Sequence, residues 1–133
     1  MTQVVVPVRY PLSDHSKATL SKAIRVASEH DAALTVLHVN LYQENRRVSR
    51  SELRQAVEAA FGHLPRTRYV VRRGLIVEET LLEEIAAQNA DLVVIGEKQT
   101  SRWRQMIQRL VDDPNVEQFL RTELDCKVVT ASP

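Results

Sequence analysis

Short runs of β-branched residues alternate with helix-forming segments along the whole chain. The first run, Val4–Val8, is apolar at every position and too short for a helix. Similar runs follow at 33–39, 68–72, 91–96 and 126–129, and the segments between them carry apolar residues at helical spacing. Strands that are apolar on both faces are typical of a parallel sheet covered by helices on both sides. The alternation therefore predicts an α/β protein built from right-handed β-α-β units.

Polar residues at the ends of these segments predict where the helices begin. Ser13 or Asp14 is expected to cap a helix that runs to about His30. Ser49, with Glu52 three residues later, forms a capping box for the next helix.

Two further helices are expected in the second half of the chain. Gly74 turns the chain from the third strand into a helix, and a longer helical stretch is expected from about Ser101. Pro114 is expected to break or restart that stretch, because an interior proline loses a backbone hydrogen bond and clashes with the preceding turn.

Length and composition favour one ordinary globular domain over residues 1–133. The formal net charge of +1 gives no overall field that would attract nucleic acid or an anionic membrane. The single cysteine, Cys126, excludes an internal disulfide and a metal site with several cysteines. No apolar stretch approaches the roughly 20 residues of a membrane span, and no secretory signal follows Met1. We therefore expect a cytoplasmic protein with no membrane partner.

The order and spacing of the segments resemble the universal stress protein family over nearly the full length. The matching segments are Val4–Val8, Leu34–Val39, Ala90–Gly96 and Leu124–Val129, with Lys127 where a proline often follows the cysteine. The resemblance implies a Rossmann-like fold of the adenine nucleotide alpha hydrolase type, with a five-stranded parallel sheet in the order 3-2-1-4-5 and helices on both faces. It also implies a homodimer and a role in stress tolerance, in some members with bound ATP.

ATP-binding members of that family carry a motif that this chain has largely lost. They place an aspartate after the first strand, a glycine after the fourth, a second glycine three residues on, and a Gly-Ser or Gly-Thr pair after nine more. This chain keeps Gly96 but has Arg9 at the aspartate and Gln99 at the second glycine. The final pair falls on Arg109–Leu110 by direct counting, or on Pro114–Asn115 when counted back from the last strand. Because glycines let the backbone approach phosphate oxygens, we expect no ATP binding of the usual kind and no cofactor.

Basic and aromatic residues stand where the glycines are missing. They are Lys98, Arg102, Trp103, Arg104 and Arg109, with Arg9 on the facing loop. One interpretation is a solvated helix face whose tryptophan packs into the sheet or a partner. The other is a remodelled pocket in which guanidinium groups hold an anion. The hydroxyl groups of Thr100 and Ser101 are compatible with either helix capping or anion binding. The candidate ligand- or anion-binding residues are Arg9, Val39, Gly96, Lys98, Gln99, Thr100, Ser101 and Arg102.

The other polar residues give weaker signals. His38 lies inside a strand and is expected to be a hydrogen-bonded structural residue, and the remaining histidines lack metal-ligand spacing. Arg46–Arg47 and Arg72–Arg73 are expected to meet across loops as a basic patch, but pairs without interleaved aromatic residues do not favour nucleic acid. No nucleophile has an evident base, so no catalytic residues are named.

The last strand is the expected dimer interface. The strand order implied by the resemblance puts it at one edge of the sheet, where free amides and carbonyls pair antiparallel with a second copy about a two-fold axis. The expected interface residues are Cys126, Lys127, Val128, Val129 and Thr130. The alternative is a monomer whose edge is guarded by the lysine of this strand.

Three functions remain open at this stage. The leading hypothesis is a non-enzymatic stress-response module, a homodimer that acts through an unknown protein partner or an atypical ligand. The second is a nucleotide- or anion-binding protein that uses arginine and lysine in place of the glycine loop, with slow phosphohydrolase activity as one form. The third, with the weakest support, is a protein associated with nucleic acid.

Overall fold

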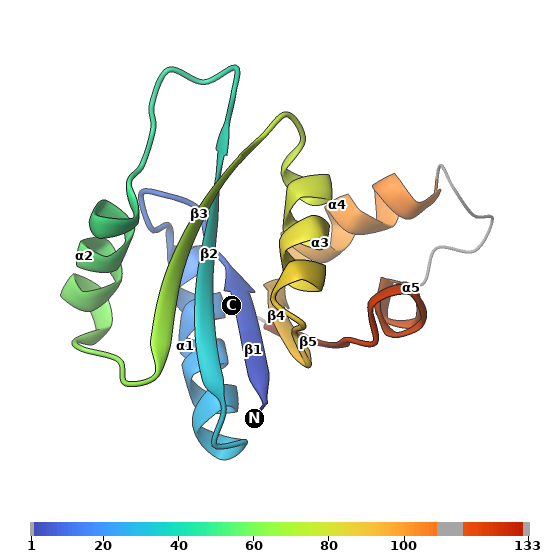
Figure 1. The fold of residues 1–133 in the computed structure, drawn as a ribbon, viewed down its shortest axis with the longest axis horizontal. Helices are drawn as coiled ribbons and strands as arrows, with labels where there is room; N and C mark the ends of the chain where they lie inside the picture. The colour runs from blue at the N-terminus through green and yellow to red at the C-terminus, as the bar shows by residue number, and fades with distance from the viewer. Residues whose placement is uncertain (1, 109–115, 132–133) are drawn as a thin grey trace.

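The computed structural model describes residues 2–108 and 116–131. Its elements are β1 (Gln3–Pro7), α1 (Asp14–Glu29), β2 (Ala33–Leu41), α2 (Arg50–Phe61), β3 (Thr67–Gly74), α3 (Val77–Ala87), β4 (Leu92–Gly96), α4 (Glu97–Gln108), α5 (Val116–Leu124) and β5 (Lys127–Ala131). All neighbouring strands are parallel, in the order β3-β2-β1-β4-β5 (Figure 1). The predicted fold class and strand order are confirmed.

Helices cover both faces of the sheet, and each face has its own apolar core (Figure 1). Alternate side chains of a strand point to opposite faces, so Val4 and Val6 join one core while Val5 joins the other. The first core contains residues of α1 and α2, including Leu20, Ala23, Leu53 and Val57. The second contains residues of α3, α4 and α5, including Leu81, Ile85, Trp103, Ile107 and Leu120. In the described part of the chain, no helix combines the length and apolarity needed to cross a membrane.

The first two helices begin where their polar residues predict. The Ser13 hydroxyl accepts a hydrogen bond from the Ser16 amide at 3.1 Å at the start of α1. Ser49 caps α2, and both bonds of the capping box are present: Ser49 Oγ accepts from the Glu52 amide at 3.1 Å, and the Glu52 carboxylate accepts from the Ser49 amide at 3.2 Å.

The helix after β4 begins earlier than predicted. α4 starts at Glu97, directly after Gly96, and not near Ser101. The expectation that Thr100 and Ser101 cap this helix is therefore wrong, because both lie inside it. The Thr100 hydroxyl instead donates to the Gly96 carbonyl at 3.2 Å, one turn back. Nothing between these residues breaks a helix, and Glu97 suits a helix start because a carboxylate complements the helix dipole there. Pro114 lies outside the described residues.

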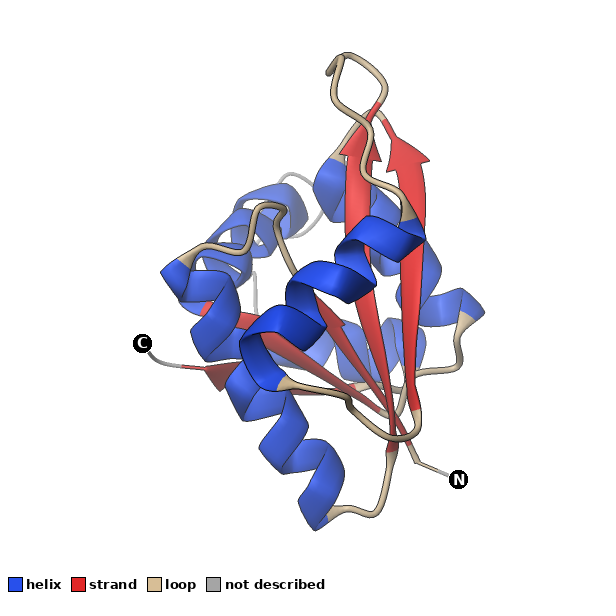
Figure 2. Ribbon diagram, turned by 90° about the vertical axis from the view of Figure 1, so that its left-hand side faces the viewer, coloured by secondary structure: helices blue, strands red, loops and turns tan. Residues whose placement is uncertain are grey.

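Two strands are longer than their apolar runs. β2 and β3 continue to Leu41 and Gly74, and their register pairs Asn40 with Arg73. Figure 2 shows these two strands extending beyond the other three at one end of the sheet. Gly74 lies close to α3, since a Cβ there would be only 2.0 Å from Oγ1 of Thr80. The long strands bring polar residues of two separate segments together at this end.

Candidate functional site

A cavity of about 400 Å³ opens at the carboxyl ends of β1, β2 and β4. The strand order reverses between β1 and β4, which is the position where ligands bind in open α/β sheets. Its walls come from the β1–α1 loop, the start of α1, the end of β2, and parts of α3 and α4.

Most of the predicted ligand-binding residues line this cavity. They are Arg9, Val39, Gly96, Lys98, Gln99 and Arg102. Lys98 and Arg102 lie on one face of α4 because they are four residues apart. Thr100 and Ser101 are not among the lining residues: the Thr100 hydroxyl is bound to the helix backbone, and Ser101 is exposed.

Gly96 has a structural explanation at the floor of the cavity. A Cβ at this position would lie 3.1 Å from Oγ1 of Thr19 in α1. That hydroxyl is held in place, since it donates to the His15 carbonyl at 2.9 Å. The glycine therefore permits close packing of α1 on β4, and its presence alone does not indicate a phosphate site.

Three cationic side chains gather at the cavity. Arg9, Lys98 and Arg102 form no ion pair with any carboxylate in the described ranges, although the carboxylate of Glu44 also lines the cavity. The backbone amide of Arg9 is occupied, because it donates to the Ser16 hydroxyl at 3.1 Å. The cavity therefore presents three cationic side chains to an anion, and the amide of Arg9 is not available to it.

The Gln99 side chain has an unsatisfied donor beside the cavity. Its Nε2 is buried and has no hydrogen-bond partner among residues 2–108 and 116–131. A buried polar group without a partner costs about 1–3 kcal/mol. Because this nitrogen is out of reach of solvent, a ligand would contact it only after the amide side chain turns towards the cavity.

His38 is hydrogen-bonded, as predicted, and also lines the cavity. Its Nδ1 lies 3.0 Å from the Val8 carbonyl oxygen, and its ring meets Tyr10 edge to face at 6.3 Å. A carbonyl oxygen only accepts, so Nδ1 carries the hydrogen and Nε2 of the neutral ring is an acceptor. The sequence did not predict that His38 lines the cavity. It also did not predict that Ser13, His15 and Ser16, at the start of α1, line it. The only available signal was their position just after the first strand.

The aromatic residue of α4 is structural. Trp103 is fully buried between α4, α3 and the sheet, and its Nε1 donates to the Glu78 carbonyl at 3.3 Å. Arg104 is exposed and does not line the cavity. Arg109–Leu110 and Pro114–Asn115, the two positions considered for the final motif pair, lie outside the described residues.

The described residues contain no cluster of three or more histidine, cysteine, aspartate or glutamate side chains able to hold a metal ion. Cys126 is buried, and burial together with the carboxylates of Asp91 and Asp125 raises the pKa of its thiol to about 11. A thiol in this state is a poor nucleophile.

A family model described as the universal stress protein family matches residues 1–129. The chain belongs to this family. No curated protein sequence gives a significant match.

Solved structures of universal stress proteins have the same fold. UspA from Lactobacillus plantarum has a TM-score of 0.63 and 21% identity, covering 98% of this chain and 97% of that protein. A universal stress protein in complex with cAMP has a TM-score of 0.62 and 19% identity, covering 98% and 97%. The protein from Archaeoglobus fulgidus in complex with dAMP has a TM-score of 0.59 and 14% identity, covering 99% and 98%.

The last strand of this universal stress protein lies at an edge of the sheet, as expected. β5 pairs only with β4, so its other side is a free edge in the described structure. Lys127 and Thr130 are exposed, whereas Val128 and Val129 pack against opposite cores. Cys126 precedes the strand and is fully buried, so its side chain lies beneath the surface of this edge.

Proposed function

We propose that this universal stress protein is a non-enzymatic stress-response module that binds a small phosphate-bearing ligand in the cavity beyond β1, β2 and β4. The observation that carries the proposal is the gathering of Arg9, Lys98 and Arg102 at one cavity without an ion-pair partner among the described residues. Guanidinium and ammonium groups make charge-assisted hydrogen bonds to phosphate, and a guanidinium can do so with two parallel bonds.

Apolar side chains of β2 and α3 also line the cavity and suit a nucleobase or another apolar group. They are Val39, Leu41, Val77 and Leu81. The volume of about 400 Å³ is near the lower end of the roughly 300–1,000 Å³ of small-molecule sites. Because universal stress proteins of similar fold form complexes with cAMP and dAMP, nucleoside monophosphates are the first ligands to test.

ATP held by a glycine loop is not part of this proposal. The helix α4 begins at Glu97, so the segment after Gly96 is helical and not a phosphate loop. We predict that ATP binds more weakly than about 100 μM. Replacing Gln99→Gly should not restore binding, because Arg9 still occupies the aspartate position. Calorimetry that found low-micromolar, magnesium-dependent ATP binding would contradict this part.

The hydroxyls at the cavity support a binding role over a catalytic one. Ser13 Oγ accepts from the Ser16 amide, and Ser16 Oγ accepts from the Arg9 amide. Neither hydroxyl is hydrogen-bonded to a histidine or carboxylate of the described residues that would activate it. We therefore place no nucleophile in the site.

The module is proposed to act as a cytoplasmic homodimer joined through β5. A parallel edge strand leaves unpaired backbone groups, and antiparallel pairing with a second copy satisfies them. Val128 and Val129 are each only partly buried at this edge, and they would gain apolar contacts on pairing.

Thermal unfolding with AMP, cAMP and pyrophosphate tests the binding proposal. A ligand at about ten times its dissociation constant adds about 1.4 kcal/mol to the free energy of unfolding and raises Tm by several degrees. Arg102→Gln should abolish most of this shift. Arg104→Gln is the matched control, because it removes an exposed guanidinium from the same helix outside the cavity. A wild-type protein that none of these ligands stabilises at millimolar concentration would overturn the proposal.

A further inference from the structure

A second groove lies on the other side of β2, at the long end of the sheet. It has a volume of about 500 Å³ and runs between the β2–α2 loop, the start of α2 and the edge strand β3. It is lined by residues 47–50, residues 69–73 and Asn40. None of these residues lines the cavity described above.

The walls of this groove are held in place by local hydrogen bonds. The Asn40 side chain donates to the Val48 carbonyl at 2.9 Å and accepts from the Val48 amide at 3.1 Å. The capping box between Ser49 and Glu52 then fixes the start of α2. These hydrogen bonds hold the β2–α2 loop against the end of β2, so the groove is already formed before a ligand binds.

Arginines from three elements meet at this groove. Arg47 comes from the loop, Arg50 from α2 and Arg73 from β3, and Arg46 precedes the first of these. In the described ranges none of the four forms an ion pair with a carboxylate, whereas Arg72 is held by Glu84. The predicted meeting of the two arginine pairs is thus observed for Arg47, Arg72 and Arg73, whereas the Arg46 guanidinium lies over the Tyr10 ring.

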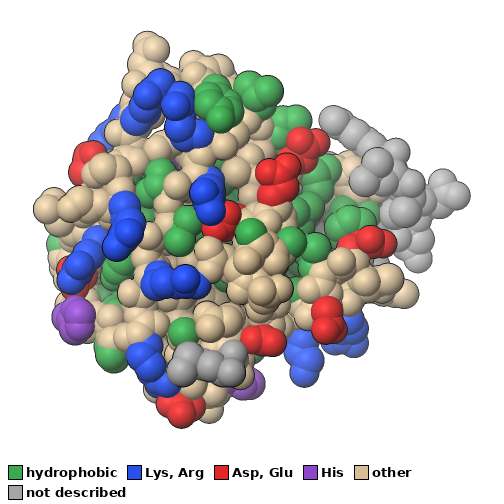
Figure 3. Space-filling view, viewed as in Figure 1, with side chains coloured by type: hydrophobic (Ala, Val, Ile, Leu, Met, Phe, Trp, Pro, Cys, Tyr) green, Lys and Arg blue, Asp and Glu red, His purple; other side chains and the backbone are tan. Residues whose placement is uncertain are grey.

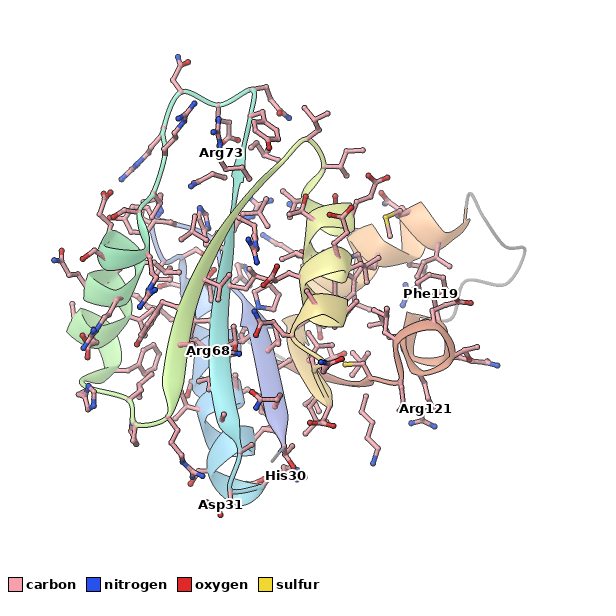
Figure 4. The ribbon with its side chains drawn as sticks, in the orientation of Figure 1. His30, Asp31, Arg68, Arg73, Phe119 and Arg121 are labelled. Atoms are coloured by element: carbon pink, nitrogen blue, oxygen red, sulfur yellow. The ribbon has the colours of Figure 1, made fainter. Side chains whose placement is uncertain are left out.

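The groove is a local positive surface on a protein of nearly zero net charge. Four arginines line the groove, at positions 47, 50, 72 and 73, and no carboxylate of the described residues does; because Arg72 is paired with Glu84, the local charge is about +3. Figure 3 shows lysine and arginine side chains gathered over the part of this face that contains the β2–α2 loop and β3, with hydrophobic side chains beside them at the top. Figure 4 shows Arg73 beside the arch of that loop.

The fold also brings two aromatic rings against these arginines, although no aromatic residue is interleaved with them in the sequence. The Arg73 guanidinium lies 4.7 Å from the ring centre of Tyr42, and that of Arg46 lies 4.9 Å from the ring centre of Tyr10. Tyr42 is 54% exposed, and backbone bonds to the end of β3 hold its position, since its amide donates to the Gly74 carbonyl at 3.0 Å. An exposed ring therefore lies against one of the arginines that line the groove.

We propose that this groove binds single-stranded nucleic acid. Sites for single strands combine a cationic groove that follows the phosphates with aromatic side chains on which bases stack. Arg47, Arg50 and Arg73 would contact phosphates, and a base would stack on Tyr42 against the face opposite its guanidinium partner. The neighbouring Leu75 is 69% exposed and extends the apolar surface available to a base. The binding is sequence-tolerant, because phosphate contacts and stacking do not depend on the identity of the base.

Fluorescence anisotropy with labelled oligothymidylate and oligouridylate of about 12 nucleotides, at about 20 mM salt, tests this proposal. Three phosphate contacts on a single strand predict a slope of log K against log salt of about −2. The double variant Arg47→Gln/Arg73→Gln should weaken binding at least tenfold, and Tyr42→Ala should weaken it about tenfold through the lost stacking. Arg25→Gln, an exposed arginine of α1, is the matched control for one lost charge and should change binding less than about twofold.

Other outcomes separate this site from its alternatives. Arg102→Gln should leave oligonucleotide binding intact, so a failure here is distinguishable from a failure of the cavity proposal. Polyglutamate of equal charge should compete poorly, because it offers no bases to stack. Equal competition by polyglutamate would assign the groove to an acidic protein segment and overturn the proposal. So would a wild-type protein that binds neither oligonucleotide at low salt, or a loss in Arg25→Gln as large as in the double variant Arg47→Gln/Arg73→Gln. The salt slope is measured on wild type, so the test does not depend on any variant folding.

Discussion

The ion pair between Arg72 and Glu84 links the edge strand β3 to α3, and its removal has a predictable cost. Arg72 Nε lies 2.6 Å from Glu84 Oε2, and Nη2 lies 3.3 Å from Oε1. The Glu84 side chain is only 5% exposed, whereas that of Arg72 is 53% exposed. Breaking a fully buried pair costs about 3–5 kcal/mol. Because solvent screens the exposed arginine and Gln88 Nε2 still donates to Glu84 at 2.7 Å, we expect Arg72→Met to cost about 1–2 kcal/mol.

The cost should depend on pH in a defined direction. Burial raises the pKa of Glu84, but the hydrogen bonds from Arg72 and Gln88 outweigh burial and leave that pKa below the ordinary value of a glutamate. A carboxyl whose pKa is lower in the folded state adds stability above its unfolded pKa, and that stability is lost as the pH falls through the folded pKa. The difference between wild type and Arg72→Met should therefore be full at about pH 7 and shrink below about pH 4.5.

Urea unfolding of wild type, Arg72→Met, Glu84→Gln and the double variant measures this coupling. Arg68→Met is the control for a lost charge on the same strand, because the Arg68 guanidinium bonds the Gln88 carboxamide and acts on Glu84 only through longer-range attraction. We expect the control to cost less than about 0.5 kcal/mol, as for an ordinary surface change. A coupling energy that is zero at neutral pH, or the same at acidic and neutral pH, would refute the reasoning.

Three further predictions concern the dimer, a glycine and the thiol. Val128→Pro removes a backbone donor from β5 and should yield monomers in light scattering. Wild-type monomers at high micromolar concentration would refute the dimer. An intact dimer in the variant would show that the interface lies elsewhere. Gly74→Ala should lower the free energy of urea unfolding by about 1–3 kcal/mol, because the new Cβ would meet Thr80 Oγ1 at 2.0 Å. Adding Thr80→Ala should recover part of the loss, and additive effects of the two substitutions would contradict the clash. Cys126 has a thiol pKa of about 11, so about one thiol in a thousand is ionised at pH 8. The thiol should therefore react with a disulfide reagent at pH 8 only after unfolding in urea. Rapid reaction of the native protein would contradict its burial.

Features set by neighbours along the chain were predictable from the sequence. The short apolar runs predicted strands, and caps such as Ser13 and the Ser49–Glu52 box predicted helix starts, because a cap acts over only three residues. The family resemblance added the strand order, which local patterns do not contain. The position of the cavity then followed, since ligands bind where strand order reverses.

The start of α4 was not predictable, because no cap marks it. The helix begins at Glu97, and the packing of Trp103 against α3 and the sheet holds it there. This packing turns Lys98 and Arg102 towards the cavity and leaves Thr100 and Ser101 outside it. A one-dimensional pattern gives the residues but not the rotation of the helix.

Only the tertiary structure decided which side chains meet at the two binding surfaces. Sequence alone predicted that the arginine pairs come together, but it had no means of placing Tyr42 against Arg73. That contact depends on the β2–β3 register, which is set by side chains buried on both faces of the sheet. In the same way, Arg9 and Arg102 lie 93 positions apart in the chain and line one cavity because β1 and β4 are adjacent strands. Residue types were determined locally, whereas their partners were determined by long-range packing.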